Sequence, residues 1–219
     1  MKKVFLLAGF ASIVLACNTN SNTSSAGQDT LNHAAHNESN SNTQNQNKMN
    51  PITATMDKMM HDMHAAKPTG NNDIDFAAMM LEHHKGAVEM SKVVVDKGSN
   101  AELKAFAQKV IDDQNKEIGL MHDFISKVEK TASSNSEEFQ KALTHSMMAM
   151  MNDNTIIYND IDKDFAAQMI PHHQSAVDMA KAYLEYGHEK SLTTLCENII
   201  SSQAKEIDWL KQWLKNKII

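Results

Sequence analysis

An internal repeat constrains this chain more than any other feature of its sequence. Residues 75–92 read DFAAMMLEHHKGAVEMSK and residues 164–181 read DFAAQMIPHHQSAVDMAK, at an offset of 89 residues. The same offset aligns Gln114 and Glu117 with Gln203 and Glu206 without a gap. A structural duplication requires only that the apolar pattern recur. The repetition of His-His, of the flanking methionines and of Gln-x-x-Glu therefore indicates chemistry as well as fold.

The apolar residues recur at intervals of three and four, which is typical of amphipathic helices, and no segment alternates as a strand does. The pattern predicts helices over about 73–97, 100–130, 160–186 and 189–215. Gly98 is placed to end the first of these, and Ser99 with Glu102 resembles a capping box for the second. Pro171 is expected to kink the third helix just before its histidines, because proline removes a backbone donor.

Four long helices with short turns predict an all-α protein, an antiparallel four-helix bundle built from two repeated helical hairpins. Two Met-rich segments, 56–64 and 145–151, are expected to form short accessory helices. The folded domain spans 51–219, with halves of about 51–131 and 136–219. If a pseudo-twofold axis relates the hairpins, the paired histidines of both halves point into a shared interior or its mouth.

The N-terminal region carries export and anchoring features. Residues 1–16 have a basic start and an apolar run, and Val14-Leu15-Ala16-Cys17 forms a lipobox, so we expect a lipoprotein signal peptide with acylation of Cys17. The alternative is an uncleaved anchor or ordinary secretion. Residues 17–50 are expected to be a disordered polar tether, since 22 of the 33 residues after Cys17 are Asn, Ser, Thr or Gln.

These features predict an exported lipoprotein of the cell envelope, facing the periplasm or the outer surface. The formal net charge of −6 and the lack of a basic patch argue against a nucleic-acid partner. With Cys17 acylated, Cys196 has no partner for an intramolecular disulfide. It lies in an apolar helical stretch and is expected to be a small core residue.

The candidate metal ligands are soft or borderline donors beside each histidine pair, together with a carboxylate from the following helix. They are Met80, His83, His84, Met90, Glu117 and Met121 in the first half and Met169, His172, His173, Met179 and Glu206 in the second. A methionine three or four residues before a histidine shares its helix face and can share an ion. Thioether and imidazole together suit copper, Cu(I) above Cu(II). Leu210 replaces Met121 in the second half, so the first site has the richer donor set.

Other interpretations of these residues stay open. Methionine is a common core filler, and a histidine on an apolar face is usually a core residue. For the carboxylates, and for Gln114 and Gln203, we favour orienting an imidazole or linking helices over direct ligation. The Met-rich segments are candidates for additional surface sites.

The repeated motif resembles the family called domain of unknown function 305. Its signature is Asp-Phe, then Met, His-His, Ala and Met, with Gln-x-x-Glu-Ile on the next helix, usually doubled. Both copies are complete here, over about residues 73–215. The resemblance implies a ferritin-like four-helix bundle and, from studied members, an exported copper-binding protein. Two positions depart between the copies: Glu82 against Pro171, and Met121 against Leu210.

The first functional hypothesis is a lipid-anchored protein that sequesters copper, confers resistance, or passes the ion to a transfer partner. The second is a ferritin-like metal-dependent oxidase. Di-iron bundles use Glu-x-x-His pairs, and the repeated His-His motif contains none in either half, so we do not expect an enzyme. The third is a purely structural helical interaction module. It predicts that changing His83 and His84 lowers stability but leaves metal content untouched.

Overall fold

The computed structural model describes residues 50–151 and 155–218. These residues form six α-helices and one short 3-10 helix, and no strand occurs among them. The helices are α1 (Pro51–Ala65), α2 (Asn72–Lys97), α3 (Ala101–Lys127), α4 (Ser136–Ser146), η1 (Met147–Ala149), α5 (Ile161–Tyr186) and α6 (Lys190–Ile218). The predicted all-α helical bundle is confirmed. The predicted signal peptide, the lipobox with Cys17 and all but the last residue of the tether lie outside the described residues.

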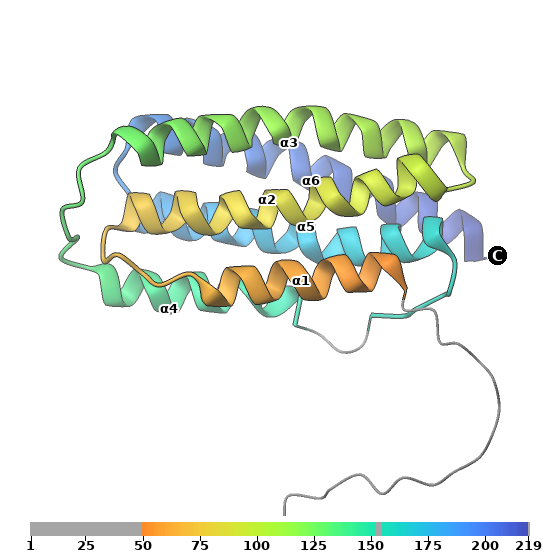
Figure 1. The fold of residues 1–219 in the computed structure, drawn as a ribbon, viewed down its shortest axis with the longest axis horizontal. Coiled ribbons are helices and arrows are strands. Elements are labelled where there is room, and N and C mark those ends of the chain that lie inside the picture. The colour runs from red at the N-terminus through yellow and green to blue at the C-terminus, as the bar shows by residue number, and fades with distance from the viewer. Residues whose placement is uncertain (1–49, 152–154, 219) are drawn as a thin grey trace, which may run out of the picture. The chain divides into compact units, whose positions relative to one another are not determined.

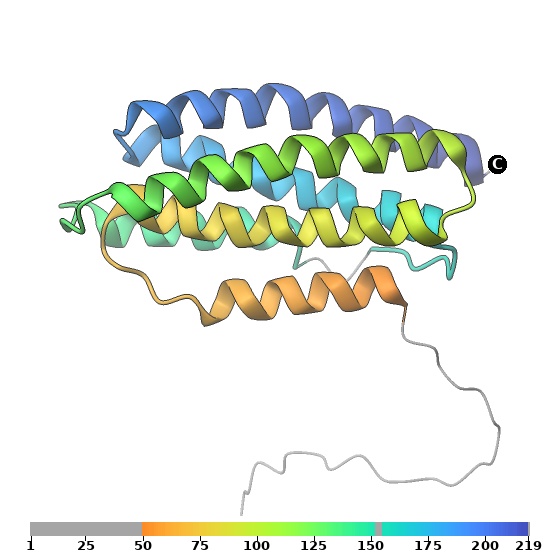
Figure 2. The ribbon, with the colours of Figure 1, turned by 45° about the horizontal axis from the view of Figure 1, so that its top comes forward.

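The helices form three layers (Figures 1 and 2). The histidine-bearing helices α2 and α5 run antiparallel to each other in the middle layer. Helix α3 packs on α2 and α6 packs on α5, forming one outer layer, while α1 and α4 cover the opposite side. The central helices are therefore buried on more than one face. No helix of the described part is both long and apolar enough to cross a membrane.

Local sequence explains where the long helices begin. Asn71, Asn100 and Asp160 each accept a hydrogen bond on the side chain from the backbone N–H three residues later, which satisfies one of the free donors of the first turn. The predicted capping box at Ser99 is wrong, because Asn100 caps α3. Ser99 instead donates its backbone N–H and its hydroxyl to Asp162 at the start of α5.

The two hairpins cap each other's turns in the same way. The Asp162 carboxylate on α5 accepts hydrogen bonds at the α2–α3 turn, and Asp73 on α2 accepts from Tyr183 Oη and His188 N at the α5–α6 turn. A side chain at Gly98, the residue that ends α2, would collide with Asp162. Each turn therefore depends on the opposite hairpin for its hydrogen bonds.

A second pair of repeated carboxylates holds the loops before the central helices. Asp75 accepts hydrogen bonds from the backbone of residues 69 and 70 and from Gln140 on α4. Asp164 accepts from Tyr158 N, Asp160 N and Asn50 Nδ2, the last of which caps α1. Both copies of the Asp-Phe motif thus tie an outer short helix to a central helix.

The structure bears on two smaller predictions, one for Cys196 and one for Pro171. Cys196 is fully buried, as expected of a core residue, and burial raises the pKa of its thiol above the usual range. Helix α5 continues through Pro171 without interruption, and the kink expected there stays a prediction.

Candidate metal centre

The two histidines of each pair point to different neighbours, because successive residues on a helix are rotated by about 100°. From α2, His83 faces the other central helix and His84 faces α3. From α5, His172 faces α2 and His173 faces α6. Each pair therefore supplies one imidazole to the middle of the bundle and one to the outer layer.

The nine predicted methionine and histidine ligands are all fully buried, at 0% relative exposure. The predicted carboxylates Glu117 and Glu206 are partly exposed, at 19% and 14% of their side-chain area. The soft donors thus lie inside the protein and the carboxylates lie at its edge.

The outward histidines form two equivalent pairs with the carboxylates of the next helix. His84 Nε2 lies 2.7 Å from Glu117 Oε2, in a hydrogen bond. His173 Nε2 lies 3.1 Å from Glu206 Oε2, within ion-pair distance but without hydrogen-bond geometry. Burial raises the pKa of Glu206, but His173 and Lys109 outweigh it and hold that pKa below its usual range. These contacts agree with the predicted role of orienting an imidazole.

The inward histidines meet at the centre of the molecule. The ring centroids of His83 and His172 are 3.7 Å apart, with an angle of 38° between the ring planes. Nε2 of His172 lies 3.2 Å from the carbonyl oxygen of His83. A carbonyl oxygen only accepts, so Nε2 carries the proton and Nδ1 keeps its lone pair. Neither that Nδ1 nor either ring nitrogen of His83 has a hydrogen-bond partner among the described residues.

The pKa of both inward histidines lies well below the usual value, first because burial disfavours the charged form and then because the neighbouring histidines repel it. They are therefore neutral at pH 7. Neutral imidazole is the form that binds a metal. A buried imidazole with unpaired nitrogens costs stability in the metal-free protein, and a ligand would remove that cost.

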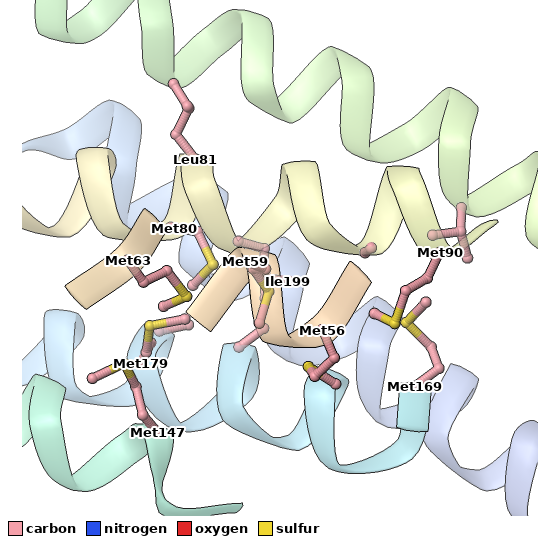
Figure 3. Close-up of a cluster of buried hydrophobic side chains, with 14 of the residues drawn as sticks. Met56, Met59, Met63, Met80, Leu81, Met90, Met147, Met169, Met179 and Ile199 are labelled. Carbon is pink, nitrogen blue, oxygen red and sulfur yellow. The ribbon is translucent and has the colours of Figure 1, made fainter. Parts of the chain in front are cut away.

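The thioethers gather along the same central helices. Figure 3 shows the side chains of Met63, Met80 and Met179 pointing toward one another, and those of Met90 and Met169 doing so further along α2 and α5. Met80 and Met169 occupy equivalent positions of the repeat, as do Met90 and Met179, so each of these methionines faces the non-equivalent methionine of the other hairpin. Met121 on α3 belongs to the same buried cluster.

One sulfur outside the predicted ligand set comes closest to an imidazole. Met59 Sδ of α1 lies 3.2 Å from His172 Nε2. Helix α1 can approach α2 this closely because Gly86 has no side chain, and an added Cβ would collide with Met59. The spacing of Met56, Met59 and Met63 marks one buried face of α1, and this signal could have identified the residue.

Met56, Met59, Met63 and Met147 lie in the core, whereas Met148 and Met151 are exposed. Met56, Met59 and Met63 therefore do not contribute to a surface site in segment 56–64, and such a site at the remaining residues of this segment stays a prediction. Among the described residues, no group of three His, Cys, Asp or Glu side chains could hold a metal ion.

The burial of His83 and His172 predicts a pH dependence of stability. Their pKa is lowered in the folded state, so the unfolded chain binds more protons once the pH falls below the usual value of 6.5. The free energy of unfolding of the metal-free protein is expected to fall below pH 6.5, by up to about 1.4 kcal/mol per pH unit for each histidine. Urea denaturation from pH 7.5 to 5.5 would measure this. A variant with His83→Leu and His172→Leu should show a flatter slope, and an unchanged slope would contradict the assignment.

Comparison with known proteins relates these features to a family. A family model described as domain of unknown function (DUF305) matches residues 73–214. The solved structure of CopM in the Cu(I)-bound form is 33% identical, with a TM-score of 0.51, over 66% of this chain and 96% of CopM. CopM in the Cu(II)-bound form is 30% identical over the same shares, with a TM-score of 0.52.

A DUF305 fragment from Deinococcus radiodurans is 20% identical over 69% of this chain and 98% of the fragment, with a TM-score of 0.51. At that identity it supports the fold alone. Comparison with curated proteins gives no significant match.

Proposed function

The chain belongs to the DUF305 family, and on that premise we propose that it binds copper, preferably Cu(I), through the buried histidines and thioethers of α1, α2 and α5. One observation carries this proposal. His172 lies against Met59 Sδ with its ring tilted against that of His83, and three of the four ring nitrogens of this histidine pair have no hydrogen-bond partner within the part of the chain that the structure describes. An imidazole beside a thioether is a soft and borderline donor set, which suits Cu(I).

The relatives support the choice of metal. CopM is described in Cu(I)-bound and Cu(II)-bound forms and shares about a third of its residues with this chain. The relatives described above are named for copper-bound forms or for the DUF305 family, and not for an enzymatic activity. We therefore propose a binding protein and not an oxidase.

We further propose that the protein is an exported lipoprotein of the cell envelope, anchored through Cys17, that sequesters copper or passes it to a transfer partner. The lipobox and the polar tether support this location. Methionine suits such an oxidising setting better than free cysteine, because a thioether binds Cu(I) without forming disulfides.

Competition for Cu(I) against a chromogenic chelator tests the proposal. The full chain is compared with a variant that carries His83→Leu, His84→Gln, His172→Leu and His173→Gln. We expect the variant to lose at least about 100-fold in affinity, since even residues that only orient a ligand contribute 10- to 100-fold.

The matched control changes two exposed histidines, His122→Gln and His188→Gln, and should bind as the parent does. Weak binding by the parent would refute the proposed function. Equal, tight binding by parent and four-histidine variant would move the copper to other residues.

A further inference from the structure

A cleft between α3 and α6 lies outside the two outward histidines. Its volume is about 340 Å³, and its walls include both copies of the Gln-x-x-Glu motif, namely Gln114, Glu117, Gln203 and Glu206. Each of these glutamates contacts a buried histidine behind it, His84 or His173. The cleft is therefore a space outside the core, and the glutamates of its wall lie between it and the buried imidazoles.

The two glutamines make the cleft wall a site for a cation. Gln114 and Gln203 are 4% and 2% exposed, and the side-chain oxygen of each has no hydrogen-bond partner among the described residues. An amide oxygen only accepts, so an unpaired one beside a carboxylate favours a positive ligand.

The repeat would make the two sides of this cleft equivalent, but one substitution breaks the symmetry. Lys109 on α3 donates to Glu206 Oε1 at 3.0 Å. The offset of 89 residues places Asn198 of α6 at the equivalent position toward Glu117, and asparagine carries no charge. Lys116 and Lys205 occupy equivalent positions on the two walls and so do not cause the difference. The charge of Glu206 is thus neutralised by a lysine, whereas the equivalent neighbour of Glu117 is an uncharged asparagine.

Aromatic packing adds to the asymmetry. Phe106 and Trp209 stack between α3 and α6, with centroids 4.4 Å apart and ring planes at 4°. These residues lie one turn beyond Lys109 and Glu206 and, with both of them, line a neighbouring hollow. The equivalent positions are Leu195 and Leu120, and Leu120 is 62% exposed. Among the described residues, the Glu117 side therefore lacks this stacked aromatic pair.

We propose that soft monovalent cations are captured through one side of this cleft, with Glu117 as the residue that first binds the ion and His84 as the next ligand. This inference rests on the proposed copper binding. The Glu117 carboxylate attracts the ion, the Gln114 and Gln203 oxygens replace part of its water, and His84 Nε2 lies 2.7 Å from the carboxylate. Lys109 prevents Glu206 from doing the same, so uptake occurs at the first half of the repeat.

The test measures uptake rate by stopped flow, with Cu(I) delivered from a chromogenic chelator to the full chain, beside the equilibrium stoichiometry. Asn198→Lys places the missing lysine at an exposed position where folding is not at risk. At 0.15 M salt it should slow uptake about 10-fold, at the lower end of the range of electrostatic steering, and leave stoichiometry unchanged. Glu117→Gln should slow uptake similarly, and Lys109→Asn should speed it by freeing Glu206.

Gln212→Lys is the matched control, because it adds the same charge on α6 about 20 Å from residue 198, beyond a Debye length of about 8 Å at 0.15 M salt. Its rate should match that of the parent. An Asn198→Lys rate equal to that of Gln212→Lys would overturn the proposal. A parent that takes up no copper at equilibrium would instead refute the proposed function, which distinguishes the two failures.

Discussion

Replacing His83 by leucine is expected to stabilise the metal-free protein, although the residue lies in the middle of the core. Both ring nitrogens of His83 are buried without a hydrogen-bond partner among the described residues. An unpaired buried polar group costs about 1–3 kcal/mol, and leucine has none. The free energy of unfolding in urea should therefore rise by roughly that amount.

His84→Leu is the matched comparison and should have the opposite sign. His84 donates to Glu117, so its removal leaves a partly buried carboxylate without that partner. We expect a loss of about 1–3 kcal/mol. If His83 were an ordinary core residue, both variants would be destabilised, and that result would favour a structural module.

With Cu(I) bound, the parent should be more stable than the His83→Leu variant, which reverses the order of stability expected for the metal-free proteins. A ligand that binds only the folded state stabilises it by about 2.7 kcal/mol at a concentration 100 times its Kd. The parent should gain this stabilisation from Cu(I), and His83→Leu should lose most of it. Thermal unfolding with and without Cu(I) measures both effects. An equal gain in the two proteins would exclude His83 as a ligand.

Asp164→Ala is expected to be the most destabilising single change on the central helices. The carboxylate is fully buried and accepts hydrogen bonds from Asn50 Nδ2, Tyr158 N and Asp160 N at 2.6–2.9 Å. Hydrogen bonds to a charged group contribute about 1.5–3 kcal/mol each, and all three donors would lose this acceptor. We expect a loss of about 3–5 kcal/mol after partial relaxation of the loop.

Asp178→Ala on the same helix provides the control for Asp164→Ala. Asp178 pairs with Lys181 at 3.6 Å on a more exposed face, and such a pair contributes at most about 1 kcal/mol. Guanidinium denaturation of both variants measures the difference. A loss below about 1 kcal/mol for Asp164→Ala would mean that the loop before α5 does not depend on this carboxylate.

Much of the fold follows from local sequence. The helix ends at Gly98 and Gly187 and the lengths of the four long helices agree with the spacing of apolar residues, within a few residues. Local sequence predicts Ser99 as the N-cap of α3, because Ser-x-x-Glu is a common capping motif. Asn100 caps instead, since the hydroxyl of Ser99 bonds Asp162, 63 residues away. The role of a residue whose partner lies far away in the sequence cannot be predicted from its sequence neighbours alone.

The candidate site likewise has features that the sequence predicts and features that it does not. The repeat identified the histidines and most of the methionines, and the structure buries all of these side chains completely. It did not identify Met59 as a neighbour of His172, because that contact depends on α1 seating against Gly86. It also did not separate Glu117 from Glu206, because only the packing of α3 against α6 brings Lys109 to one of them.

The sequence by itself determined the helices and the set of soft donors, because helix formation depends on the local spacing of apolar residues and the donors appear as identical letters in both copies. Only the tertiary structure decided which donors meet. His83 and His172 are 89 residues apart, and their contact exists because two hairpins pack with their central helices antiparallel. The direction of each side chain relative to its covering helix then sets whether a histidine meets a sulfur, a carboxylate or another imidazole.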